Sequence, residues 1–222
     1  MDRAPIEEDS FHHVYNRGTD KRVIFDDDHD YRRFILYLNV LNDTDILSPN
    51  TFEELLLREA DGPTGERLVN IIAFCLMPNH YHLLLHERTP GGISKFMQRL
   101  GTAYTMYFNE KNDRSGALFQ GRFKSKLVDD DEYIIKVIDY IHLNPKEIMN
   151  LSDYRWSSYH DYCGESRFKK FLWKDDLTDF FEVPTEYRNW LKDQRDFSEI
   201  HHIAIDGPKS KKNRYKLEGS TF

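Results

Sequence analysis

Two histidines separated by a single residue lie in an apolar segment, and their type and spacing could bind a metal ion. His80 and His82 flank Tyr81 in the stretch MPNHYHLLLHE. In an extended strand alternate side chains point to the same face, so both imidazoles could reach one cation while Tyr81 points away. The pair alone is a weak signal, because the chain has ten histidines and this spacing also arises by chance.

A tyrosine and an asparagine four positions apart form a second candidate group. Tyr140 and Asn144 would lie on one face of a helix. Asn144 precedes Pro145, where helical conformation is disfavoured, so its amide is expected at a helix end. A phenol with a pKa of about 10 is almost wholly neutral at pH 7, so as a nucleophile Tyr140 needs local activation or a metal-polarised electrophile. The alternative is that Tyr140 is a core residue with a satisfied hydroxyl.

The distribution of charge favours a nucleic-acid partner, although the net charge does not. A formal net charge of −7 argues against binding to a phosphate backbone. Between Lys95 and Lys126, however, there are seven basic and two acidic residues, whereas between Asp43 and Glu66 seven carboxylates oppose one arginine. This asymmetry predicts an electropositive face on an acidic body, and solvated helix faces are the alternative.

Length and composition predict a cytoplasmic protein. The chain of 222 residues can bury a substantial core. Its apolar runs are far shorter than the roughly 20 residues of a membrane span, and the acidic N-terminus does not resemble a signal peptide, so we expect a soluble protein without membrane association. Cys75 and Cys163 lie far apart, which suggests neither a disulfide framework nor a cysteine-ligated zinc site.

Hydrophobic periodicity predicts the elements that must position these residues. Their order is strand, helix, strand, strand, helix, strand, helix. The expected ranges are 11–18, 26–42, 69–77, 81–87, 93–109, 122–130 and 131–145, with a turn at Pro78 and Asn79 between the second and third strands. The simplest architecture is α+β: a ferredoxin-like sandwich in which helices pack on one face of an antiparallel sheet.

The pattern also predicts a main domain and an extension. Residues 1–164 form the main domain, with an insertion at about 43–69 that holds a short helical candidate at 51–60. Residues 165–222 form a C-terminal extension. Its segment 209–216 has five basic residues and no acidic one, which is typical of a disordered cationic tail.

Four blocks together resemble a known family. They are CLMPNHYHLLL, SKFMQRLGTAYTMYFN, GALFQGRFKSKLVDDDEY and DYIHLNP. In this order they are similar to the REP-associated tyrosine transposases, the IS200-like single-tyrosine branch of the HUH endonucleases. The resemblance covers residues from about Phe11 to Gly164, which it implies to be an HUH transposase domain.

The resemblance implies a role for each candidate residue. His80 and His82 would bind a divalent cation, Mg²⁺ or Mn²⁺, with Asn144 as the third ligand, and Tyr140 would be the nucleophile. Tyr133 competes for that role on the same helix. Its partner four positions later is Val137, which cannot bind a metal, so Tyr140 is the better candidate.

The activity implied is cleavage and transfer of single-stranded DNA. Tyr140 would attack a phosphate, release a 3′-hydroxyl and form a 5′-phosphotyrosine link that a later hydroxyl reverses. The substrate would be hairpin-bearing DNA, either REP-like or an element end, bound by a monomer or a homodimer. Five basic residues are expected to follow its phosphates: Lys95, Arg99, Arg122, Lys124 and Lys126.

One departure and two alternative functions stay open. Where the family usually continues after Asn-Pro with an Arg-Ala-Gly type sequence, this chain has KEIMN, so a phosphate contact by that arginine is in doubt. One alternative is a catalytically silent regulator, derived from a transposase, that still binds DNA hairpins. The other is a metal-dependent hydrolase, which the absence of a carboxylate at ligand spacing disfavours.

Overall fold

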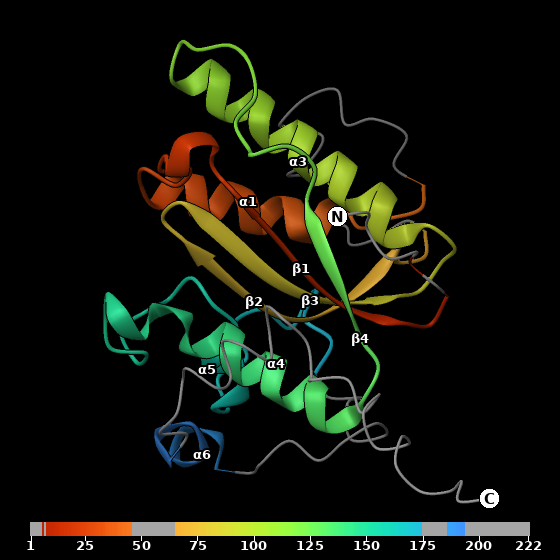
Figure 1. Ribbon diagram of the computed structural model, residues 1–222, viewed down its shortest axis with the longest axis vertical. Helices are drawn as coiled ribbons and strands as arrows, with labels where there is room; N and C mark the ends of the chain where they lie inside the picture. Colours follow the sequence, from red (N-terminus) through yellow and green to blue (C-terminus); the bar gives the residue numbers. More distant parts are fainter. Residues whose placement is uncertain (1–5, 7, 46–64, 175–185, 194–222) are drawn as a thin grey trace, which may run out of the picture.

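The computed structural model describes residue 6 and residues 8–45, 65–174 and 186–193 (Figure 1). The helical candidate at 51–60 and the cationic tail at 209–216 lie outside the described residues. Most of the predicted insertion at 43–69 also lies outside them.

A four-stranded antiparallel sheet forms the centre of the molecule, in the order β2-β3-β1-β4. The strands are β1 (Phe11–Arg17), β2 (Val69–Met77), β3 (His80–Glu87) and β4 (Lys124–Val128). The predicted turn at Pro78 and Asn79 joins β2 to β3, so that Met77 pairs with His80. Strand β2 is buried along its whole length, as its uninterrupted apolar sequence predicts.

Three long helices cover the sheet. They are α1 (Asp28–Val40), α3 (Gly92–Lys111) and α4 (Asp131–Leu143). The order β1, α1, β2, β3, α3, β4 and the strand arrangement confirm the predicted ferredoxin-like α+β fold. In Figure 1, α1 and α3 lie together on one side of the sheet and α4 lies on the other.

The prediction that helices pack on one face holds for α1 and α3 but not for α4. On β3, the Tyr81 ring contacts Phe34 of α1, whereas the next residue, His82, contacts Tyr140 of α4. Successive strand residues point to opposite faces, so α4 packs on the face that α1 and α3 leave open. The apolar side of α4 includes Val137 and Ile141, which are fully buried. The sheet is therefore covered on both faces.

Local sequence fixes where the helices begin. Asp27 caps α1 in a reciprocal capping box with Asp30, and Asp130 caps α4 by accepting from the backbone N–H of Tyr133. Before α3, Gly91 adopts a φ of 72°, which favours glycine. The Glu87 carboxylate accepts from the backbone N–H groups of Gly91 and Ile93 at this helix start.

The chain after α4 packs against the sheet edge and against α4. Short helices follow at η2 (Asn144–Glu147), α5 (Tyr159–Tyr162) and α6 (Tyr187–Asp193), in addition to η1 (Thr19–Lys21) near the N-terminus. Bridges from Ser157 to Cys75 and from Leu172 to Ile71 cover the outer edge of β2. In the described ranges, no helix combines the length and apolar character needed to cross a membrane.

Candidate active site

The histidine pair lies at the start of β3, next to the hairpin turn. The His80 and His82 ring centroids are 5.1 Å apart and the rings are nearly perpendicular. His80 Nδ1 lies 2.7 Å from the side-chain oxygen of Asn79. Because that oxygen only accepts, Nδ1 carries the proton and Nε2 keeps its lone pair. Burial lowers the pKa of His80 to about 4, partly opposed by the Asn144 side chain, so the ring is neutral at pH 7.

Tyr140 reaches this pair from α4. Its ring lies edge-on to His82, with centroids 5.3 Å apart and an interplanar angle of 89°. The residue is 2% exposed, and burial raises the pKa of the phenol to about 12. The phenol is therefore neutral at pH 7, and its proton must leave before or during any attack.

Asn144 joins the group from the end of α4, as its position before Pro145 predicts. Its amide nitrogen donates to the backbone oxygen of Tyr140 at 3.0 Å. The side-chain oxygen is the atom of Asn144 that could bind a cation. The Asn144 side chain affects the pKa of both His80 and Tyr140, because it lies beside both rings. The structure thus brings together the four residues that the sequence singled out, from β3 and from α4.

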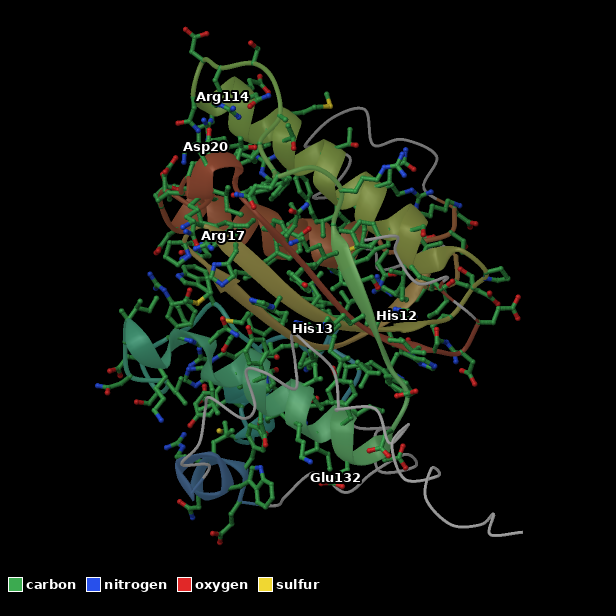
Figure 2. All side chains as sticks on the ribbon, viewed as in Figure 1. His12, His13, Arg17, Asp20, Arg114 and Glu132 are labelled. Atoms are coloured by element: carbon green, nitrogen blue, oxygen red, sulfur yellow. The ribbon has the colours of Figure 1, made fainter. Side chains whose placement is uncertain are left out.

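Strand β1 adds three residues that the sequence reasoning missed. Side chains 13, 15 and 17 lie on the face that holds the histidine pair (Figure 2 labels His13 and Arg17). His13 Nε2 lies 2.9 Å from His82 Nδ1, Tyr15 stacks on His82 with ring centroids 5.6 Å apart, and Arg17 pairs with His80 across the strands. Their alternation was visible in the sequence, but the position of β1 next to β3 was not.

Two of the predicted DNA-binding lysines lie on the same face. Lys126 pairs with His13 and Lys124 pairs with Tyr15 on the edge strand β4. The Lys124 ammonium lies 5.8 Å from the centroid of the Tyr15 ring. Directly paired residues share a face of the sheet, so these lysines and Arg17 border the histidine pair.

The other predicted DNA-binding residues are placed elsewhere. Lys95 and Arg99 lie on α3, on the opposite side of the sheet from Tyr140. The Arg99 guanidinium donates to the backbone oxygen of Asp43 at 2.6 Å, at the end of α1, and burial lowers its pKa. The structure therefore does not bring all five basic residues into one surface.

Arg122 lines a groove of about 690 Å³ between α3 and residues 117–123. Two kinds of side chain line the groove. Apolar and aromatic groups come from Met97, Met106, Phe119 and Phe123, and polar groups come from Ser94, Gln98, Thr102 and Thr105. Arg122 is the one charged residue among those that line it, so the groove has no carboxylate that would repel a phosphate.

Three further polar residues on α4 lie in other surroundings. Tyr133 is 3% exposed, and burial raises the pKa of its hydroxyl to about 12. Lys136 donates to Glu132 at 2.6 Å in an exposed ion pair. His142 is fully buried between Tyr187 and Ser158, which supports a structural role.

The donor set at the histidine pair fits a divalent cation. Two neutral imidazoles and one amide oxygen supply neutral ligands, and phosphate oxygens could complete the shell. Within the described parts of the chain, no cluster of three or more His, Cys, Asp or Glu side chains offers a competing site. Mn²⁺ tolerates imidazole better than Mg²⁺ does.

Comparison with known proteins identifies the class to which this region is similar. Residues 54–144 match the family described as "Transposase IS200 like". The matched segment contains the histidine pair, Tyr140 and Asn144, so the resemblance predicted from the sequence is confirmed.

Two particular proteins are similar to the chain. The "Putative REP-associated tyrosine transposase" of Haemophilus influenzae is 27% identical over 104 residues, which cover 40% of this chain. The match spans 58% of that relative, a little over half its length. A solved structure of a REP-associated tyrosine transposase bound to a REP hairpin covers 82% of this chain and 94% of its own, with a TM-score of 0.47 and 15% identity.

Proposed function

We propose that this protein cleaves and rejoins single-stranded DNA as an IS200-like tyrosine transposase. One observation carries the proposal. A helix-borne phenol, Tyr140, lies against a strand-borne histidine pair, with 5.3 Å between its ring centroid and that of His82. Asn144 completes the donor set one helical turn later. The match of residues 54–144 to the IS200-like family supports the same reading.

In the proposed reaction Tyr140 is the nucleophile. Its Oη forms a bond to phosphorus while the bond from phosphorus to the 3′ oxygen breaks, and the phenol proton ends on the departing 3′-hydroxyl. The product is a 5′-phosphotyrosine link. Attack by another 3′-hydroxyl reverses the step, which joins strands without nucleotide hydrolysis.

The two histidines and Asn144 would hold Mg²⁺ or Mn²⁺. Such a cation, when bound, withdraws electron density from the scissile phosphate. The residues themselves contribute orientation: Asn79 holds the His80 ring, and the amide nitrogen of Asn144 is held by the Tyr140 carbonyl.

We propose hairpin-bearing single-stranded DNA, REP-like or an element end, as the substrate. Lys124, Lys126 and Arg17 border the histidine pair on the same sheet face and would contact phosphates. Arg122 and the groove beside α3 would extend this surface around the edge strand. The domain that carries this activity would be residues 1–164, followed by the extension 165–222.

A covalent-adduct assay tests the proposal. Purified protein is incubated with end-labelled single strands that carry a hairpin, with Mn²⁺, and denaturing gels reveal protein that retains label. We expect an adduct with the native protein, none with Tyr140→Phe, and unchanged hairpin binding by both. Binding without any adduct in the native protein would instead support the catalytically silent DNA-binding alternative.

A further inference from the structure

A buried histidine on β1 contacts one member of the proposed metal-binding pair from the neighbouring strand. His13 is 0% exposed and its Nε2 lies 2.9 Å from Nδ1 of His82. The two rings are nearly parallel, with centroids 5.1 Å apart. Neither the sequence pattern nor the family resemblance gave His13 a role.

The hydrogen bond between two neutral imidazoles has only two forms. Either His82 Nδ1–H donates to His13, or His13 Nε2–H donates to His82. In the first form His82 Nε2 keeps a lone pair for a cation. In the second form His82 Nε2 carries the proton and cannot bind one. The direction of this one bond therefore decides whether His82 can be a ligand.

The other member of the pair shows the same arrangement. His80 Nδ1 donates to the side-chain oxygen of Asn79 at 2.7 Å, so the lone pair of the ring is on Nε2. Asn79 in turn donates its amide nitrogen to the backbone oxygen of Lys21 at 3.2 Å, so its oxygen faces His80. Each histidine thus has a hydrogen-bond partner at Nδ1.

The surroundings of His13 hold its ring in place. Tyr140 lies edge-on to it, with ring centroids 5.7 Å apart, and the ring centroid of Tyr15, two residues later on β1, lies 5.2 Å away. The His13 ring is fully buried among these rings. One side chain therefore contacts both the proposed ligand and the proposed nucleophile.

We propose that His13 is a positioning residue that accepts the Nδ1–H of His82 and thereby directs the Nε2 lone pair of His82 toward the cation. The proposal rests on the proposed function, since it concerns the same site. It assigns His13 no contact with DNA or with the cation. Residues that orient metal-binding histidines in this way typically change metal affinity by about 10- to 100-fold when they are lost.

Two measurements without DNA test the proposal. Long-range ¹⁵N–¹H spectra of the native protein without metal report which nitrogen of each histidine carries the proton. We expect protonated Nδ1 on His82 and an unprotonated His13 Nε2. A proton on His82 Nε2 would overturn the proposal, and this measurement needs no variant.

Titration with Mn²⁺, followed by electron paramagnetic resonance, gives the second readout. We expect His13→Phe to weaken Mn²⁺ binding about 10- to 100-fold and His13→Gln, whose amide oxygen can accept the same bond, to recover most of the loss. The matched control is His12→Gln. His12 is also fully buried but bonds to Ser10 and Ser125 on the opposite face, so Mn²⁺ affinity should stay native.

These outcomes separate this proposal from the proposed function. Native Mn²⁺ affinity in His13→Phe, or an equal loss in His12→Gln, would overturn the role of His13. His80→Ala in the same titration tests the metal site itself. Undiminished Mn²⁺ affinity in this variant would show that His80 is not a ligand and that the proposed metal site is wrong. Neither the Mn²⁺ titration nor the spectra require DNA cleavage, so both would test the role of His13 even if the protein did not cleave DNA.

Discussion

The Tyr140 ring meets the His82 ring edge-on, with centroids 5.3 Å apart, although one residue comes from a helix and the other from a strand. Their separation depends on how α4 packs against the sheet, and Val137 and Ile141 provide that packing as fully buried apolar residues. The candidate site is therefore built on two rigid elements, and its geometry follows from the core.

Removing charge from β4 should reduce the salt dependence of DNA binding. Each phosphate contact on a single strand contributes about 0.7 to the slope of log affinity against log salt. Lys124→Ala and Lys126→Ala should each lower the magnitude of the slope by roughly that amount, measured by fluorescence anisotropy with a labelled hairpin strand.

Arg155→Ala is the matched control for these lysines. Arg155 pairs with Asp28 and lies over Trp156, whose backbone oxygen bonds to β2 at the opposite edge of the sheet from β4. The substitution Arg155→Ala removes one positive charge far from the proposed DNA-binding residues, so the slope of log affinity against log salt should stay native. Equal changes in all three variants would indicate a general charge effect and contradict the assigned surface.

Arg99→Ala should reduce stability more than it reduces DNA cleavage. The Arg99 guanidinium donates to the backbone oxygen of Asp43, and hydrogen bonds to charged groups contribute about 1.5–3 kcal/mol. Because the side chain is only partly buried, we expect a loss at the lower end of that range in urea unfolding. Normal stability with weakened hairpin binding would instead show that Arg99 contacts the DNA.

Filling the groove beside α3 should weaken hairpin binding without harming the fold. Gly101 lies in the middle of α3, and a Cβ atom there would meet nothing within 4 Å. A glycine inside a helix costs about 0.5–1 kcal/mol relative to alanine, so Gly101→Ala should stabilise the protein and keep binding.

Gly101→Leu extends the side chain into the groove, and we expect hairpin affinity to fall by roughly tenfold or more, equal to about 1.4 kcal/mol. Anisotropy titrations and thermal unfolding of the alanine and leucine variants give the comparison. If the leucine variant binds as tightly as the alanine variant, the groove is not part of the DNA-binding surface.

Ionisation of Asp139, next to the nucleophile, should lower the free energy of unfolding as pH rises. Burial raises the pKa of Asp139 from 3.8 to about 6, partly opposed by hydrogen bonds from Trp190 and Tyr187. A folded-state pKa above the unfolded value means that this contribution to stability is present below the unfolded pKa and is lost as pH passes through the folded one. A shift of this size corresponds to at most about 3 kcal/mol.

Urea unfolding of the native protein and Asp139→Asn at several pH values between 4 and 7 should show this effect. The free energy of unfolding of Asp139→Asn should increase relative to that of the native protein as pH rises. The lowered pKa of His80 and of His142 contributes the opposite trend in the native protein. Parallel pH profiles would show that Asp139 does not titrate in this range.

The sequence was sufficient to predict the elements and to select four candidate residues that lie together, because local patterns determine them. The His80 and His82 spacing, the turn at Pro78 and Asn79, and the spacing of Tyr140 and Asn144 each depend on one element. The side of the sheet on which α4 packs depends on contacts between distant elements, and the prediction of helices on one face failed there.

The remaining site residues depend on strand order and on individual contacts. His13 and Arg17 lie at the site because β1 is inserted between β3 and β4, and pairing between distant strands is not readable from local spacing. The count of charges grouped Arg99 with Lys124 as DNA-binding residues. It could not show that the Arg99 guanidinium donates to the backbone oxygen of Asp43, just after α1. The grouping of the four candidate residues was thus predictable, while the residues that surround them were not.

The most direct test is to identify the residue that becomes attached to DNA. The covalent adduct formed with Mn²⁺ is digested with nuclease and trypsin, and mass spectrometry locates the nucleotide remnant. We expect the peptide that contains Tyr140 to carry a phosphotyrosine remnant at that residue. A remnant on Tyr133, or on any residue outside the histidine-pair face, would contradict it.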